Sequence, residues 1–320
     1  MTEKVVVLGS GYAGAGAVQS LERTLDDDAE ITWISDVDHH LVLHESHRCI
    51  RDPDVQKHVR ISVEDVKSPE TSFRQGTVVG LDTDERTVHL ADGDAVGYDY
   101  LLVGIGTRTA FFGIEGLETH AHTLKSLDDA LAIHEDLETV SQNATQTDPA
   151  RVVVGGAGLS GIQVAGEVAE FRDERSAPIE VVLVEGLDEI FPGNAAAVQQ
   201  ALRSRLEARD VDIHTGDFVS AVDESTIAIG DAEDLSYDVL VWTGGITGHE
   251  SVRETGLDKH ERNFRLEADR TFRTSDDRVF AIGDAALVEQ SGEEPAPPTA
   301  QAAWQAAEVA GKNIARDIRG

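Results

Sequence analysis

Valine-rich apolar runs predict the first strands of two similar units. Residues 4–8 and 152–154 contain such runs, which are typical of strands buried on both faces of a parallel sheet. A glycine-rich turn follows each run, and a helical pattern comes next, over 13–21 in the first unit. A second strand is predicted at 30–36 and again at 179–185. The pattern therefore predicts two strand–turn–helix–strand units in one chain.

Both turns have the spacing G-x-G-x-x-G. The first glycine of such a turn permits a tight bend, the second lets a pyrophosphate approach the backbone, and the third lets helix and strand pack closely. An acidic residue, Asp36 or Glu185, ends each second strand about twenty residues further on, where a carboxylate can accept hydrogen bonds from a ribose. The six glycines are Gly9, Gly11, Gly14, Gly156, Gly158 and Gly161.

The duplication extends beyond the glycine turns. Segment 98–104 (YDYLLVG) matches 237–244 (YDVLVWTG), and turn-rich segments at 77–94 and 218–234 precede them. Each unit is thus expected to contain a small antiparallel meander and a closing parallel strand. We predict an α/β fold with two Rossmann-like dinucleotide-binding domains, each with a β-meander. Two dinucleotides in one chain favour hydride transfer between a nicotinamide and a flavin.

Composition limits the remaining choices. The chain has 320 residues, enough for two ordinary domains, and no apolar run long enough to span a membrane. With a single cysteine, Cys49, and no signal peptide pattern, we expect a cytoplasmic protein, with peripheral contact to the inner face of the cell membrane as an alternative.

The charge is strongly acidic, with 27 basic and 60 acidic residues and a formal net charge of −33. This field would repel nucleic acid and anionic surfaces at low salt. The acids are scattered along the chain, and we interpret them as a solvation adaptation typical of salt-accumulating organisms such as haloarchaea.

The motifs together resemble the two-dinucleotide-binding flavoproteins, with a fold like that of the pyridine nucleotide-disulfide oxidoreductases, and are most similar to the type II NADH dehydrogenases. The segments that carry the resemblance are 9–17, 98–109, 155–170, 279–286 and 297–311. The resemblance implies an FAD-binding domain in two segments, 1–115 and 246–320, and an inserted NADH-binding domain at 116–245. It implies an enzyme that takes hydride from NADH to FAD and passes electrons to a quinone-type acceptor.

Site residues follow from the resemblance by position. Gly283 and Asp284 should meet the flavin ribityl and phosphate, and Gly106 and Thr107 should border the flavin. Further FAD contacts are expected at Tyr12, Ala13, Ser35, Asp36, Val79, Ala300 and Ala302. NADH contacts are expected at Leu159, Ser160, Glu185, Gly244 and Gly245.

One predicted helix carries the candidate acceptor site. Thr299 is a plausible N-cap for a helix that starts at Ala300, and the positive end of its dipole would stabilise negative charge on a reduced flavin. Gln301 and Gln305 lie at i and i+4, on one helix face. In the enzymes that the chain resembles, two glutamines at this spacing line the quinone site, so we predict that role here. The resemblance leaves the oligomeric state open, with a homodimer as one option.

The sequence departs from the family pattern at three places. Ser35 stands where the family often has its ribose carboxylate, with Asp36 next. Gln163 stands where type II enzymes usually carry a glutamate that faces the nicotinamide and flavin, and an amide cannot relay a proton. The sequence also ends at Gly320, where the family normally continues to a membrane-docking helix, so the chain is trimmed, docks by other means or is soluble.

Two other functions stay open. A flavin-dependent disulfide or peroxide reductase would use Cys49, with His47, Arg48 and Arg51 able to lower its pKa. A redox sensor would bind FAD and NADH without turnover. The nearby histidines also raise the question of a metal site, because His40, His44 and His47 would share one face of a helix, but no metal-binding motif completes them and we predict none.

Overall fold

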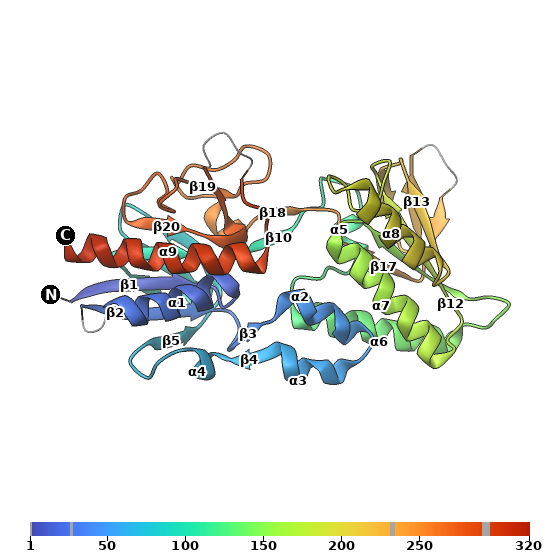
Figure 1. Cartoon of the computed structure of the whole chain (residues 1–320), viewed down its shortest axis with the longest axis horizontal. Coiled ribbons are helices and arrows are strands. Elements are labelled where there is room, and N and C mark those ends of the chain that lie inside the picture. The colour runs from blue at the N-terminus through green and yellow to red at the C-terminus, as the bar shows by residue number, and fades with distance from the viewer. Residues whose placement is uncertain (1, 26–27, 231–233, 290–294) are drawn as a thin grey trace. The chain divides into compact units, whose positions relative to one another are not determined.

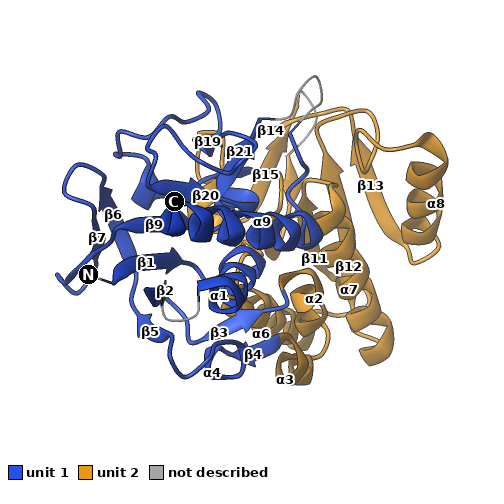
Figure 2. Ribbon diagram, turned by 60° about the vertical axis from the view of Figure 1, so that its left-hand side comes forward, with its two compact units in different colours: residues 1–42, 60–108, 246–320 blue, residues 43–59, 109–245 orange. Residues whose placement is uncertain are grey.

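A computed structural model gives the fold over residues 2–25, 28–230, 234–289 and 295–320. The chain divides into two compact units (Figure 2). Unit 1 comprises residues 1–42, 60–108 and 246–320, and unit 2 comprises 43–59 and 109–245. Each unit contains its own parallel sheet, as the repeated sequence pattern predicts.

The sheet of unit 1 has the strand order β20-β9-β1-β2-β5, and neighbouring strands in it pair in parallel. Its strands are β1 (Glu3–Leu8), β2 (Ala29–Ser35), β5 (Ser72–Gln75), β9 (Tyr100–Val103) and β20 (Val279–Ala281). Helices α1 (Tyr12–Leu25) and α9 (Ala300–Arg319) lie side by side against this sheet (Figure 1). Their approach is close because Gly16 faces Ala307, whose Cβ lies 2.9 Å from the position of an added glycine Cβ.

Smaller elements complete unit 1. The antiparallel meander consists of β6 (Val78–Asp82), β7 (Thr87–Leu90) and β8 (Ala95–Gly97). The strand pairs are β3 (His39–Leu41) with β4 (Arg60–Ser62), β10 (Thr107–Thr109) with β18 (Ile246–Gly248), and β19 (Leu266–Ala268) with β21 (Ala286–Val288). Short helical turns are α4 (Val63–Val66), η3 (Glu250–Val252) and η4 (Gly283–Ala285).

Unit 2 repeats this plan with a sheet of order β13-β12-β11-β17. Its strands are β11 (Ala150–Gly155), β12 (Ile179–Glu185), β13 (Val211–Thr215) and β17 (Val239–Trp242). Its meander consists of β14 (Val219–Val222), β15 (Thr226–Ile229) and β16 (Leu235–Ser236), and residues 231–233 of the expected meander segment lie outside the described residues. The helices are α5 (Leu117–His120), α6 (Leu127–Asn143), α7 (Leu159–Arg175) and α8 (Ala196–Glu207). The predicted meander is therefore present in both units.

Segment 43–59 packs within unit 2, although the sequence-based boundaries place it in the first FAD segment. It forms α2 (Leu43–Ser46), η1 (His47–Ile50), η2 (Pro53–Val55) and α3 (Gln56–Val59). His134 of α6 bonds through Nδ1 to the Ile50 carbonyl at 2.9 Å. Arg51 donates to Glu167 of α7 at 2.9 Å. These contacts hold the segment against α6 and α7.

The expectation of a shared helical face for His40, His44 and His47 is wrong. His40 lies in strand β3 of unit 1, whereas His44 lies in α2 and His47 in η1 of unit 2. The i, i+4 spacing gives a common face only inside one continuous helix. Within the described part of the chain, no three His, Cys, Asp or Glu side chains are grouped as metal ligands.

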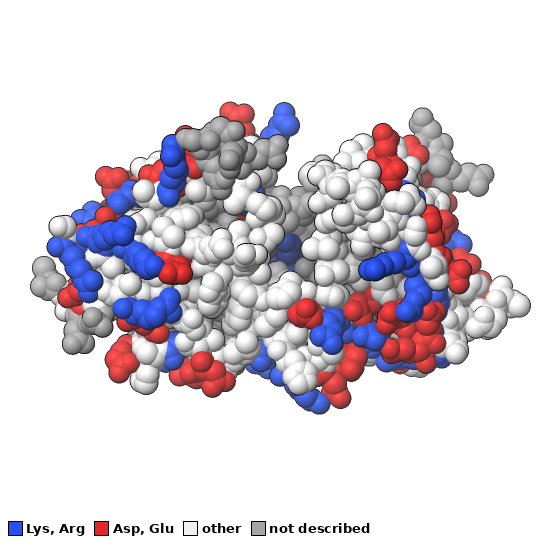
Figure 3. Space-filling model, in the orientation of Figure 1, with Lys and Arg blue, Asp and Glu red and all other residues white. Residues whose placement is uncertain are grey.

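On the face drawn in Figure 3, acidic and basic side chains are interspersed on both units rather than gathered in one segment. Several carboxylates share one cation: Arg51 contacts Glu170 at 3.2 Å and Glu174 at 2.7 Å, both on α7. Ion pairs near the surface contribute little each, and salt screens them.

Candidate cofactor sites

The glycine turn of unit 1 is shaped by close backbone approaches. Gly9 has φ +92°, and a Cβ there would lie 2.5 Å from the carbonyl oxygen of Gly104. A Cβ on Gly14 would lie 1.8 Å from the Gly9 carbonyl oxygen, so only glycine lets α1 start this close to β1. Nothing lies within 4 Å of the Cβ position of Gly11. That open side of the turn is where the glycine spacing predicts a pyrophosphate.

The glycine turn of unit 2 repeats the same contacts. Gly156 has φ +89°, and its added Cβ would lie 2.6 Å from the Cα of Gly244. The third glycine, Gly161, would place a Cβ 1.8 Å from the Gly156 carbonyl oxygen, and Gly158 faces open space. The predicted packing role of the third glycine is confirmed in both turns.

The second strand ends in a different kind of side chain in each unit, a carboxylate in unit 2 and a hydroxyl in unit 1. In unit 2 the Glu185 carboxylate accepts from the amides of Ala157 and Leu187, at 2.8 and 3.0 Å. In unit 1 the Ser35 hydroxyl donates to the Ser10 hydroxyl at 2.9 Å, and Asp36 is exposed. Glu185 therefore links β12 to the glycine turn and, because each carboxylate oxygen has two lone pairs, can still accept from a ribose.

A buried histidine supports the first glycine turn. The Nδ1 of His40 lies 2.8 Å from the Ser10 carbonyl oxygen, and the imidazole packs edge-on against Tyr12 at 4.8 Å between ring centroids. Burial lowers the pKa of His40. A carbonyl can only accept, so His40 donates from Nδ1 in its neutral form. Tyr12 also contacts Trp304 of α9, at 6.4 Å between ring centroids.

The turn that carries Asp284 lies against the first turns of two helices. Gly283 begins η4 with φ +63°, and its added Cβ would lie 2.9 Å from the Cβ of Ala13 in α1 and 3.3 Å from that of Ala303 in α9. The N-cap prediction for α9 is confirmed, because Thr299 accepts from the Ala302 amide at 3.2 Å and the helix starts at Ala300. Unit 1 thus brings together the first glycine turn, Asp284 and the start of α9.

The remaining candidate residues lie as follows. Gln301 and Gln305 are exposed on α9, and Trp304 beside them is 42% exposed. Val79 is exposed on the meander, Gly106 has φ +70° with open space around it, and Thr107 begins β10. In unit 2, Leu159 and Ser160 are exposed at the start of α7, Gln163 is half-buried one turn later, and Gly244 and Gly245 follow β17.

Cys49 is not an activated thiol. The side chain is 0% exposed, and burial, followed by the charge of Asp52, raises its pKa to about 11. Arg48 acts in the opposite direction but does not outweigh burial. The expectation that basic neighbours could lower this pKa is therefore wrong, because desolvation of the thiolate is the larger effect.

Two supporting residues were missed by the sequence analysis. Thr243 donates to the carbonyl oxygens of Gly155 and Gly156, at 3.1 and 2.8 Å, and so braces the second glycine turn. Thr243 directly precedes Gly244 in the repeated segment 237–244, and this position could have indicated its role. Arg265 contacts the Asp284 turn, and no local pattern marks it, since the contact spans residues far apart in the sequence.

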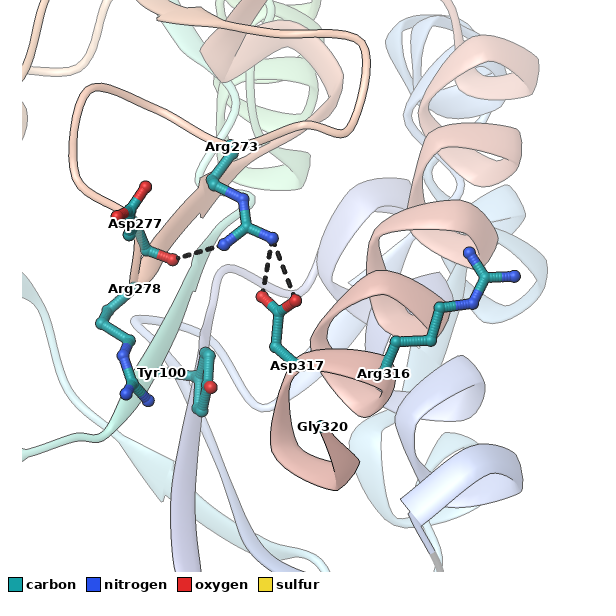
Figure 4. Close-up of a pocket in the computed structure, with 7 residues that line it drawn as sticks. All are labelled: Tyr100, Arg273, Asp277, Arg278, Arg316, Asp317 and Gly320. Atoms are coloured by element: carbon teal, nitrogen blue, oxygen red, sulfur yellow. Dashed lines mark hydrogen bonds and ion pairs between the residues drawn. The ribbon is translucent and has the colours of Figure 1, made fainter.

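A shallow pocket of about 410 Å³ lies elsewhere in unit 1, at the end of α9 (Figure 4). There Arg273 pairs with Asp317 at 2.7 Å and donates to the Asp277 carbonyl at 2.9 Å, while Arg278 stacks over the Tyr100 ring. None of the proposed cofactor residues lines this pocket. We assign it no part in the chemistry.

Searches against known proteins give consistent matches. The chain is 28% identical over 336 aligned positions to a type II NADH:quinone oxidoreductase of Staphylococcus aureus, covering 99% of this chain and 83% of that protein. The structure of NDH2 from Plasmodium falciparum in complex with NADH matches with a TM-score of 0.86 and 17% identity, over 98% of this chain and 83% of that one. The sulfide:quinone oxidoreductase of Aquifex aeolicus matches with a TM-score of 0.83 and 20% identity, over 99% and 77%.

In the described ranges, no helix is long and apolar enough to cross a membrane.

These matches confirm the predicted fold class and the resemblance to type II NADH dehydrogenases. The family model of the pyridine nucleotide-disulphide oxidoreductases matches residues 3–307. The chain therefore belongs to the pyridine nucleotide-disulphide oxidoreductase family.

Proposed function

We propose that the protein is an FAD-dependent NADH dehydrogenase that passes electrons to a quinone. The observation that carries the proposal is the pair of glycine turns, each with an open second glycine, Gly11 in unit 1 and Gly158 in unit 2. A chain that uses this turn twice has a place for each of two dinucleotides. The match along nearly the whole of a type II NADH:quinone oxidoreductase supports the same activity.

FAD is assigned to unit 1. The turn at Gly9, Gly11 and Gly14 would receive the pyrophosphate, and the Asp284 turn lies against the same end of α1. The amides at the start of α9 would face negative charge on the cofactor, because a helix N-terminus carries about half a positive charge. When bound, FAD would accept the hydride of NADH and pass its two electrons on to the quinone. Tyr12, Gly106 and Thr107 complete the proposed contacts.

NADH is assigned to unit 2. The Glu185 carboxylate, oriented by its two amide donors, would accept hydrogen bonds from the adenosine ribose hydroxyls. A 2′-phosphate in the same place would put two negative charges in contact. Gly186 and Leu187, which follow Glu185, offer no cation to receive it. We therefore infer a preference for NADH over NADPH.

The quinone is assigned to the exposed face of α9 that carries Gln301 and Gln305. Their amide N–H groups can donate to a quinone carbonyl and hold its ring near the start of the helix. Trp304, partly exposed on the same helix, offers an apolar wall. A membrane quinone would require peripheral contact with the bilayer, which co-flotation of the protein with quinone-loaded vesicles would detect.

The test is an anaerobic titration with NADH followed by addition of a soluble quinone. The protein should purify with the visible spectrum of bound flavin, lose that absorbance with one equivalent of NADH and regain it with quinone. A protein without flavin, or one whose flavin NADH leaves oxidised, contradicts the proposal.

A sensor that binds both cofactors without turnover is the second candidate. Gln163, half-buried in the first turns of α7, favours it, because an amide cannot take part in proton transfer where the related enzymes carry a glutamate. Steady-state consumption of NADH with quinone in excess separates the two candidates. Flavin reduction without repeated turnover would support the sensor.

A further inference from the structure

Arg265 is a buried cation beneath the turn that carries Asp284. Its side chain is 6% exposed. Nε donates to the Asp284 carbonyl at 2.7 Å, and Nη2 donates to the Ala286 carbonyl at 2.6 Å. These two donors lie on one edge of the planar guanidinium, so a single rigid group fixes both carbonyls.

The same turn also packs against two helices. Gly283 packs against Ala13 and Ala303, where an added Cβ would lie 2.9 and 3.3 Å from their Cβ atoms. The strand that follows Arg265, β19, pairs in parallel with β21, which starts at Ala286. The Asp284 turn is thus in contact with the starts of two helices and with the guanidinium, and Arg265 is the cation in this set of contacts.

The positive charge itself needs an explanation. Burying a guanidinium is costly, and burial lowers the pKa of Arg265, while the charge of Asp284 acts in the opposite direction. In the described part of the chain, no salt bridge within 4 Å is formed by Arg265. A neutral amide side chain could also donate hydrogen bonds to these carbonyls, and burying it would cost less free energy than burying a charged guanidinium. Negative charge at the turn favours a cation here: the Asp284 carboxylate supplies part of it, and a bound phosphate would add to it.

We propose that Arg265 is a positioning residue of the flavin site, which fixes the Asp284 turn through two carbonyls and adds positive charge below the bound dinucleotide. The inference rests on the proposed function, because it takes Asp284 to contact FAD. Arg265 would not touch the reacting atoms. It would act on flavin affinity through the position of Asp284.

The experiment measures the dissociation constant of FAD by diluting the full-chain holoprotein in molar salt and following the fluorescence of released flavin. Arg265→Met should weaken FAD binding by about tenfold or more, since hydrogen bonds to charged groups contribute strongly. Arg265→Lys keeps the charge but cannot bond two carbonyls along one edge, and should fall between Met and the parent. Arg262→Met, at an exposed arginine three positions away, is the matched control and should bind as the parent does.

A double-mutant cycle with Asp284→Asn tests whether Arg265 acts through the turn. If it does, the Arg265→Met change should weaken FAD binding much less in the Asp284→Asn background than in the parent. Thermal unfolding of each variant shows whether the whole chain is folded, and the Lys variant covers the case in which the Met variant does not fold.

The outcomes separate the two proposals. A parent that binds no FAD overturns the proposed function and this inference with it. A parent that binds FAD, with Asp284→Asn weakened but Arg265→Met and Arg265→Lys unchanged, leaves the function standing and overturns the inference. Fully additive effects in the cycle also overturn it, because Arg265 would then act only as a structural residue.

Discussion

The carboxylate of Glu185 accepts a hydrogen bond of 2.8 Å from the backbone amide of Ala157, so the end of β12 is tied to the middle of the glycine turn. Its other oxygen accepts from the Leu187 amide at 3.0 Å. In unit 1 the equivalent tie is the bond between Ser35 and Ser10. In unit 2, the carboxylate that is proposed to bind the ribose, Glu185, therefore also orients the glycine turn.

Replacing Glu185 with Gln should weaken NADH binding and reduce the preference for NADH. The side-chain NH2 group of Gln would face one of the two backbone N–H donors and cannot accept its hydrogen bond. The donor left without an acceptor would cost about 1–3 kcal/mol. KM for NADH should rise about tenfold, and the ratio of kcat/KM between NADH and NADPH should fall because the repelling charge is gone. Glu224→Gln, at an exposed acid of the same unit, serves as control. An unchanged cofactor ratio would contradict the role of Glu185.

Two glycines of the first turn should respond differently to substitution. Gly11→Leu places its side chain in open space, so the protein should fold but lose FAD. Gly14→Ala places a Cβ 1.8 Å from a backbone oxygen, and should destabilise the chain by about 3 kcal/mol or more. Thermal unfolding and flavin absorbance measure the two effects. Full yellow colour in Gly11→Leu would refute the FAD assignment.

Loss of the two exposed glutamines of α9 should affect the quinone half-reaction alone. The variant with Gln301→Leu and Gln305→Leu should reduce NADH:quinone turnover by about tenfold, since two hydrogen-bond donors to the quinone are removed. Flavin reduction by NADH in stopped flow should stay near the parent rate. Gln200→Leu on α8 is the control for an exposed glutamine. Parent-like quinone kinetics in molar salt would exclude α9 as the acceptor site.

The Cys49 thiol should be inert in the folded protein. Its pKa of about 11, raised by burial, leaves almost no thiolate at neutral pH. We expect alkylation by iodoacetamide only after unfolding, and Cys49→Ala should keep NADH:quinone activity. Rapid labelling of the native chain, or loss of turnover in the alanine variant, would instead favour the disulfide or peroxide reductase.

Stability should fall as the pH drops below the usual histidine range. Burial lowers the pKa of His40, His47 and His249 below the ordinary histidine value of 6.5. The unfolded chain therefore takes up protons near pH 6.5 while the folded chain resists them, so the free energy of unfolding rises with pH until it levels off above 6.5. Each histidine contributes a slope of at most about 1.4 kcal/mol per pH unit.

Denaturant unfolding between pH 5 and 8 measures this dependence. His40→Gln should remove one of the three contributions and so reduce the slope between pH 5 and 6.5. The exposed His58, replaced by Gln in a parallel variant, provides the control. Identical slopes for the parent and His40→Gln would show that His40 titrates alike in both states.

The amino-acid sequence by itself determined the two repeated units. The apolar runs fixed β1 and β11, glycine spacing fixed the turns that follow, and Thr299 fixed the start of α9. These features are local, because they depend on periodicity, on backbone sterics and on hydrogen bonds between residues close together in the chain. They were sufficient for the fold class and for the two candidate dinucleotide sites.

Only the tertiary structure decided the surroundings of the functional groups. It placed His40 in a strand, buried Cys49 so that desolvation outweighs its basic neighbours, and brought Arg265 under the Asp284 turn. Each of these outcomes depends on which distant segments exclude water from a side chain or supply its partner. A pKa and a long-range hydrogen bond are set by that packing, which no pattern along the chain encodes.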